Sequence, residues 1–141
     1  MAEAPELDLV VKQITALASD IAAFELVAGD GGTLPRFTAG SHIPVKLPNG
    51  LERQYSLCND PREQDRYVIA VHAAPNSRGG SLALHRDVKA GMHLRTGMPQ
   101  NFFGLDEGAD GFLFLAGGIG ITPIRAMILR AEALGRPWQL V

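Results

Sequence analysis

The chain has 141 residues, 46% of them hydrophobic and 20% charged, which is enough apolar material for a folded core and excludes a wholly disordered protein. Its formal net charge of −2 gives no electrostatic reason to bind nucleic acid or an anionic membrane. The single cysteine, Cys58, excludes an internal disulfide and a four-cysteine iron–sulfur cluster within this chain.

The N-terminus and the apolar runs predict neither export nor membrane insertion. The start is acidic and lacks a basic segment followed by an apolar one, so no signal peptide is expected. No apolar run approaches the roughly 20 residues that span a bilayer. The four histidines share no short spacing, so no metal site is expected. We therefore expect a cytoplasmic protein with no nucleic-acid or membrane partner.

The first two thirds of the chain has the pattern of short strands separated by turns. Glycine- and proline-rich segments such as Pro48-Asn49-Gly50 divide β-prone runs, and one helix over 81–88 interrupts them before Gly91. The fold class that this predicts is mainly β, a six-stranded antiparallel Greek-key barrel with one helix. The expected strands are 9–17, 21–27, 42–47, 51–58, 66–72 and 92–96.

The last third changes to an alternating strand and helix pattern. The apolar run 112–115 predicts a parallel strand covered on both faces, and 138–141 begins a second strand. Between them a helix begins near Pro123, with Thr122 as its expected cap, and ends at Gly135. This β-α-β unit is expected to be a truncated start of an α/β nucleotide-binding domain.

Three segments follow from this change of pattern. Residues 1–105 are predicted to form the barrel domain, with Phe102 and Phe103 closing it as core. Residues 106–110 form a polar linker, and 111–141 form the N-terminal fragment of the nucleotide-binding domain. One sheet face of that fragment would lack cover, which leaves self-association through the incomplete sheet open.

A glycine turn at 117–123 has the composition of a phosphate-binding loop. Gly117, Gly118 and Gly120 allow a sharp turn and a close approach of the backbone to a ligand. The helix that follows directs free N–H groups and a partial positive charge at the loop. The turn is neither a complete G-x-G-x-x-G, since Pro123 takes the place of the last glycine, nor a P-loop.

Two further motifs carry groups that suit a ring system with a phosphate. Arg53-Gln54-Tyr55-Ser56 lies on an expected strand, where a guanidinium can hold phosphate oxygens and a tyrosine ring offers a flat surface. Arg78-Gly79-Gly80-Ser81 opens the first helix as an anion site. Taken singly, each motif also fits an ordinary edge strand or a loop with an N-cap serine.

In this order and spacing, the three motifs resemble the ferredoxin–NADP⁺ reductase superfamily, with the closer likeness to phthalate dioxygenase reductase and the reductase component of vanillate O-demethylase. The resemblance covers essentially all 141 residues. It implies that Ser56 lies near flavin N5 as the catalytic residue. It also implies that the flavin is held by Arg53, Tyr55, Ser56, Ala70, Val71, His72, Gly79, Gly80 and Ser81. The nicotinamide nucleotide would be approached by Gly117, Gly118, Gly120 and Thr122.

The resemblance further implies an NAD(P)H-dependent flavoprotein oxidoreductase, the reductase component of an oxygenase system. FMN is expected rather than FAD, because the Arg-Gly-Gly-Ser form is similar to the FMN-using branch. Electrons would pass from NAD(P)H through the flavin to an iron–sulfur domain or oxygenase partner, with no iron–sulfur cluster in this chain. The alternative is a flavin-binding module without NAD(P)H turnover. A domain that binds no cofactor, with glycine loops that only shape turns, also remains open.

Overall fold

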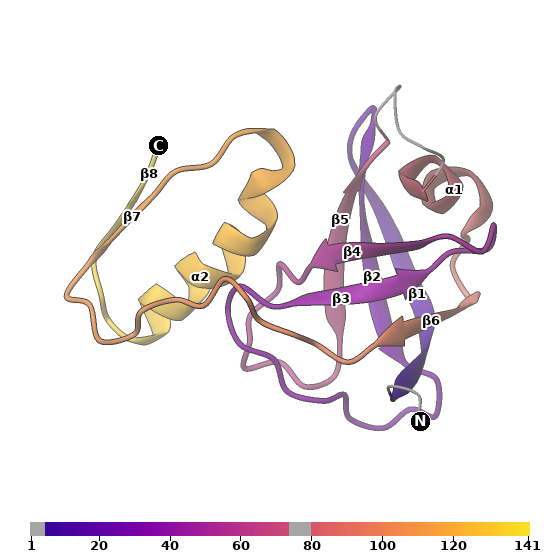
Figure 1. Ribbon diagram of the computed structural model, residues 1–141, viewed down its shortest axis with the longest axis horizontal. Helices are drawn as coiled ribbons and strands as arrows, with labels where there is room; N and C mark the ends of the chain where they lie inside the picture. The colour runs from indigo at the N-terminus through magenta and orange to yellow at the C-terminus, as the bar shows by residue number, and fades with distance from the viewer. Residues whose placement is uncertain (1–4, 74–79) are drawn as a thin grey trace.

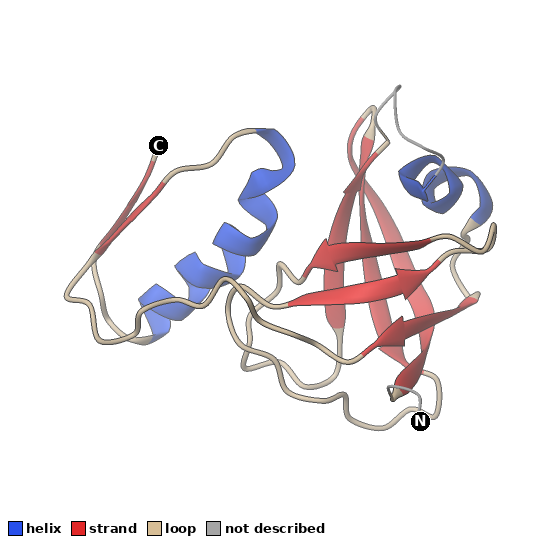
Figure 2. Cartoon of the chain, viewed as in Figure 1, coloured by secondary structure: helices blue, strands red, loops and turns tan. Residues whose placement is uncertain are grey.

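The computed structural model describes residues 5–73 and 80–141, which form a six-stranded antiparallel sheet followed by a smaller α/β unit (Figure 1). Helix α1 (Gly80–Asp87) lies at one end of the large sheet (Figure 2). The six strands are β1 (Glu6–Ala18), β2 (Ile21–Ala28), β3 (His42–Lys46), β4 (Glu52–Ser56), β5 (Tyr67–His72) and β6 (His93–Gly97).

The large sheet has the strand order β4-β3-β6-β1-β2-β5, with every neighbouring pair antiparallel. Its strands alternate between buried and partly exposed side chains, as β5 does with Tyr67, Ile69 and Val71 turned inward. Two irregularities in the β1–β2 register bend the long strand β1, so the sheet curls around one apolar core. The six expected strands and helix α1 are confirmed within a few residues at each end.

The expected closed barrel is corrected in one respect, because β4 and β5 remain the two edges of the sheet. Beyond the end of β4, Cys58 N donates to Val68 O at 2.9 Å. Asn59 then bridges the gap, since its Nδ2 donates to Arg66 O and its Oδ1 accepts from Val68 N, both at 3.0 Å. One buried amide side chain thus takes the place of part of the missing ladder.

The C-terminal unit packs α2 (Ile121–Ala133) between a two-stranded parallel sheet and the six-stranded sheet (Figure 1). The parallel strands are β7 (Phe112–Phe114) and β8 (Trp138–Leu140), and the short 3₁₀ helix η1 (Gly118–Gly120) precedes α2. Phe114 packs with Ile124 and Met127 of α2 in a second core.

Cover on both faces, as expected for the strand at 112–115, is not provided by any of the residues that the structure describes. Leu113 and Leu115 are 62% and 68% exposed, because only the α2 side of the two-stranded sheet has a partner. Phe102 and Phe103 also differ from the expected core positions, being 84% and 58% exposed. No helix within the described residues is long and apolar enough to cross a membrane.

The two units are joined by close contacts around the loop before β3. Ala39 of that loop belongs to the second core, with Phe114 and Met127. Gly40 has a φ of +98°, and a Cβ there would lie 2.0 Å from Phe103 O, so only glycine fits. Asn101 Nδ2 donates to Thr38 Oγ1 at 2.6 Å and to Ala39 O at 2.9 Å. The loop before β3 is thus held by Asn101 and Phe103 on one side and packs against Phe114 and Met127 of the C-terminal unit on the other.

Candidate functional site

A cavity of about 400 Å³ lies between β4, β5, the start of α1 and the start of α2. It brings together seven of the residues that the sequence marked, contributed by five elements, β4, β5, α1, η1 and α2. These seven are Tyr55, Ser56, Ala70, His72, Ser81, Gly120 and Thr122. Sequence reasoning missed three other lining residues, Gln54, Ile119 and Pro123. Alternation along β4 could have found Gln54, because it shares a strand face with Ser56.

Tyr55 connects β4 with α1 at one end of the cavity. Its ring packs against the main core, and its Oη lies within 3.4 Å of Ser81 Oγ, a distance at which either hydroxyl can donate. Burial raises the pKa of Tyr55, although the hydrogen bond with Ser81 and the charge of Arg53 oppose that shift. The phenol therefore stays neutral at physiological pH and presents its hydroxyl beside the helix N-terminus.

Positive charge and free N–H groups gather at this same end. Arg53 does not line the cavity, but it shares a face of β4 with Tyr55, and its Nη1 donates to Glu52 O at 2.9 Å. Gly80 and Ser81 form the first turn of α1, where backbone N–H groups have no partner within the helix. Gly79 lies outside the described residues. A guanidinium and a helix N-terminus together suit an anionic group such as a phosphate.

Strand β5 forms one wall of the cavity through alternate residues. Ala70 and His72 line it, whereas the Val71 side chain is turned into the core and its carbonyl accepts from His85 Nε2 at 2.7 Å. His72 Nε2 donates to Asp20 Oδ2 at 2.7 Å, which holds the imidazole in place. Asp20 is 52 residues away in the chain, so no local pattern pointed to it.

Ile119 and Gly120 of the glycine turn form the opposite wall, with η1 as the central turn, whereas Gly117 and Gly118 do not line the cavity. Gly117 is extended, Gly118 has a φ of +56°, and Gly120 N donates to Gly117 O at 3.1 Å. A Cβ added at Gly117, Gly118 or Gly120 would meet no atom within 4 Å. Packing among the described residues therefore does not require these glycines, and the space beside the turn is open to a ligand.

The prediction that Thr122 caps α2 is wrong. Helix α2 begins at Ile121 with Gly120 as its N-cap, and no side chain caps it. Thr122 is already inside the first turn, and its hydroxyl donates to Ile119 O at 3.1 Å. The 3₁₀ turn before α2 extends the helical path toward the glycines, which moves the cap upstream of Thr122.

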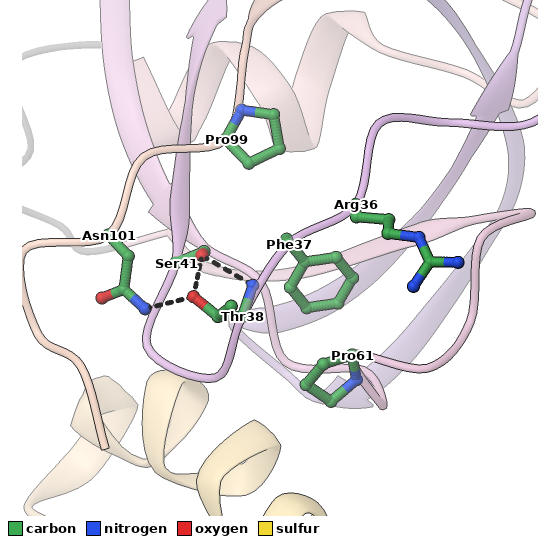
Figure 3. Close-up of a pocket in the computed structure, with 7 residues that line it drawn as sticks. All are labelled: Arg36, Phe37, Thr38, Ser41, Pro61, Pro99 and Asn101. Atoms are coloured by element: carbon green, nitrogen blue, oxygen red, sulfur yellow. Dashed lines mark hydrogen bonds between the residues drawn. The ribbon is translucent and has the colours of Figure 1, made fainter. Parts of the chain in front are cut away.

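A different cavity of about 330 Å³ lies beneath the loop before β3 and holds none of the predicted site residues (Figure 3). Its polar groups are largely committed to one another, because Thr38 N donates to Ser41 Oγ at 3.2 Å and Asn101 bonds Thr38 Oγ1. Figure 3 shows this cluster on the side away from the Arg36 guanidinium. This cavity is thus formed entirely by loops of the first unit.

No protein-family model matches the chain. Among curated proteins it is 51% identical to "Tetrachlorobenzoquinone reductase" of Sphingobium chlorophenolicum, over 95% of this chain and 41% of that protein. It is 47% identical to "Vanillate O-demethylase oxidoreductase" of Acinetobacter baylyi, over 95% of this chain and 42% of that protein. The solved structure of phthalate dioxygenase reductase matches with a TM-score of 0.93 and 43% identity, over 96% of this chain and 42% of the other. The chain spans about two fifths of the length of these relatives.

Proposed function

We infer that this chain belongs to the phthalate dioxygenase reductase branch of the ferredoxin–NADP⁺ reductase superfamily, and on that premise we propose that it binds FMN in the cavity between β4, β5, α1 and α2. The observation that carries the proposal is the convergence of the sequence motifs on one cavity. Its volume of about 400 Å³ lies within the range of small-molecule sites. An aromatic ring, a hydroxyl, a guanidinium and a helix N-terminus suit the parts of a phosphorylated ring system.

In this proposal the two ends of the cavity take different parts of the flavin. Arg53 and the first turn of α1, at Gly80 and Ser81, hold the phosphate, because both provide positive potential there. Gly79, which lies outside the described residues, is proposed for the same role. Tyr55 lies against the ring or the ribityl chain, and Ser56 lies near the ring nitrogen that accepts hydride. Ala70 and His72 wall the ring, whereas Val71 contributes only its backbone because its side chain is in the core.

The preference for FMN over FAD rests on the Gly-Gly-Ser helix start, which supplies a site for a terminal phosphate. A monophosphate gains most from two charge-complementary groups at one end of a site, because its charge is concentrated there. This preference is directly measurable, since the two flavins share the same ring and differ only beyond the phosphate.

For the reaction, we propose that the glycine turn approaches the pyrophosphate of NAD(P)H through Gly117, Gly118, Gly120 and Thr122. Bound flavin supplies the capacity to accept hydride and to release electrons singly. The chain's own residues orient the two nucleotides, and electrons leave to an iron–sulfur domain or an oxygenase partner. One relative, from Pseudomonas putida, is named as the reductase subunit of a phthalate dioxygenase, which supports the choice of acceptor.

The test is a visible-absorption titration of the folded chain with FMN, FAD and riboflavin. We expect FMN to bind most tightly and Arg53→Ala to weaken FMN at least about tenfold, as loss of a charge-assisted contact predicts. Riboflavin lacks the phosphate, so its affinity should not change in Arg53→Ala. Arg95→Ala, which removes an exposed arginine of β6 that pairs with Glu6, serves as the matched control.

Three outcomes decide between the candidate functions. A folded chain that binds none of the three flavins overturns the flavin proposal. An equal loss of FMN and riboflavin in Arg53→Ala overturns the phosphate role of Arg53. Anaerobic addition of NADH to the FMN complex then separates a reductase, which bleaches the flavin absorbance, from a flavin-binding module, which does not.

A further inference from the structure

A second cavity, of about 260 Å³, lies on the outer face of β2 and β5, beneath the start of α2. Ala70 and Thr122 line both this cavity and the proposed flavin cavity, so the two are adjacent. Apart from these two residues, none of the residues assigned to flavin or nicotinamide lines it. Its apolar walls include Ala23, Val68 and Ile121, which come from three elements.

The charged groups of this apolar cavity are all of one sign. Two guanidiniums line it, those of Arg66 and Arg125, and no carboxylate of the described residues does. Arg66 is compensated from outside the lining, because it pairs with Glu25 at 2.7 Å and Glu63 at 2.5 Å. These two ion pairs hold the Arg66 side chain in place in the cavity wall and largely neutralise its charge, so it has little attraction for another anion.

Arg125 has the opposite balance of charge. Its Nη1 donates to Cys58 O at 2.6 Å, and no carboxylate of residues 5–73 and 80–141 pairs with it. A guanidinium has five N–H donors in a planar fork, so one bond to a neutral carbonyl leaves most of them available. That single bond also anchors the side chain at the cavity, which lowers the entropy lost when a ligand binds.

We propose that this cavity binds a small monoanion with a flat apolar body, of which an aromatic carboxylate is the simplest example. A dry cavity of about 150 Å³ accommodates benzene, so 260 Å³ has room for one ring and a carboxylate. Aliphatic and methyl groups of Ala23, Val68 and Ile121 contact the ring. The carboxylate accepts hydrogen bonds from the free N–H groups of Arg125, because the planar forks of a guanidinium and a carboxylate match in geometry.

The two cavities are adjacent but separate. Ala70 and Thr122 lie between the two spaces, and all other residues that line this cavity are absent from the lining of the proposed flavin cavity. The site itself requires no flavin, because neither Arg125 nor Ala23 lines the flavin cavity. Binding is therefore expected in the flavin-free chain as well as in the presence of FMN.

The test uses para-fluorobenzoate as the probe, with fluorine NMR and calorimetry on the flavin-free chain. We expect one site of millimolar or better affinity, with the neutral para-fluorobenzamide at least about tenfold weaker, because it lacks the charge that pairs with Arg125. Saturating FMN should leave the affinity unchanged within about twofold, as expected for separate sites. The absence of binding to the folded chain, equal affinity for the amide, or displacement of the probe by FMN overturns the proposal.

Two variants test the position of the site independently. Arg125→Met keeps a long unbranched side chain but removes the charge, and it should lower the affinity for para-fluorobenzoate at least about tenfold. Ala23→Phe fills the cavity from β2, leaves Arg125 unsubstituted and should abolish binding. Because this second variant is independent of the first, the test stays valid if Arg125→Met folds poorly. Arg136→Met, in the exposed turn after α2, is the control and should bind normally. Normal binding by both test variants places the probe elsewhere and refutes the site.

Discussion

Replacing Gly40 by alanine tests whether the junction between the two units depends on one backbone contact. Gly40 has a φ of +98°, and an added Cβ would lie 2.0 Å from Phe103 O and 3.0 Å from Met127 Cε. Gly91 provides a matched control, because its φ is +92° and an added Cβ meets nothing within 4 Å. The difference between Gly40→Ala and Gly91→Ala therefore isolates the contact from the backbone strain that both share.

The magnitude follows from two contributions. A left-handed backbone costs a non-glycine residue about 1–2 kcal/mol, which is the whole effect expected of Gly91→Ala. In Gly40→Ala the Cβ must also separate from Phe103 O by about 1 Å, since such atoms do not approach within 3.0 Å. That shift strains both hydrogen bonds of Asn101 to the loop, at about 1 kcal/mol each. We expect Gly40→Ala to lower the free energy of unfolding by about 3–4 kcal/mol.

Urea denaturation followed by two signals measures this effect and locates it. Far-ultraviolet circular dichroism reports on the large sheet, and the fluorescence of Trp138, the single tryptophan, reports on the C-terminal unit. We expect the loss to appear most strongly in the Trp138 signal, because the added Cβ also lies 3.0 Å from Met127 Cε, and Met127 belongs to the same core as Trp138. Equal destabilisation by Gly40→Ala and Gly91→Ala would refute the reasoning, since backbone strain alone would then account for both.

Three further predictions concern the core, the open edge of the sheet and the exposed face. Burial raises the pKa of Tyr67 to about 12, whereas a tyrosine in the unfolded chain ionises near pH 10. The contribution of the neutral Tyr67 side chain to the free energy of unfolding is therefore complete below pH 10 and is lost as the pH rises toward 12. Tyr67→Phe should therefore remove about 2 kcal/mol of the alkaline decline in stability, measured by denaturation from pH 9 to 12, and an unchanged decline would contradict this. Asn59→Ala should lower the free energy of unfolding by about 2–4 kcal/mol, because it leaves two buried backbone groups unpaired. Asn49→Ala, in an exposed turn, is the control and should lower it by less than about 1 kcal/mol. Equal losses of stability in denaturation would argue against the bridging role of Asn59. The double change Leu113→Lys and Leu115→Lys should leave stability unchanged and weaken self-association in sedimentation velocity, and a wild-type chain that stays monomeric at high concentration would exclude association through this face.

Much of the fold could be predicted from the sequence, because secondary structure leaves local periodicities in the chain. A β-prone run after a turn signal located β5, and apolar spacing located α2. Gly117 and Gly118 marked the turn between β7 and α2 for the same local reason. The resemblance added the order of the motifs, which places Tyr55 and Ser81 in one site although 26 residues separate them.

Other features depend on packing between distant segments, and local patterns do not contain them. The positions of Phe102 and Phe103 could not be predicted from hydrophobicity, because an aromatic residue is buried only where another element covers it. The pairing of His72 with Asp20 depends on the β2–β5 register near Ile21, and the second cavity depends on where α2 lies on the sheet. The cap of α2 moved because a 3₁₀ turn forms before it.

By itself, then, the sequence determined which segments become strands and helices, since these follow from residue type and spacing, whereas the resemblance supplied the site residues that we propose. Only the tertiary structure decided that β4 and β5 stay unpaired edges bridged by Asn59, and that the space between them and α2 forms two adjacent cavities. The physical reason is that strand order, curvature and helix placement depend on the packing of the whole core. The Gly40 contact and the Arg125 hydrogen bond to Cys58 then fix where the units meet.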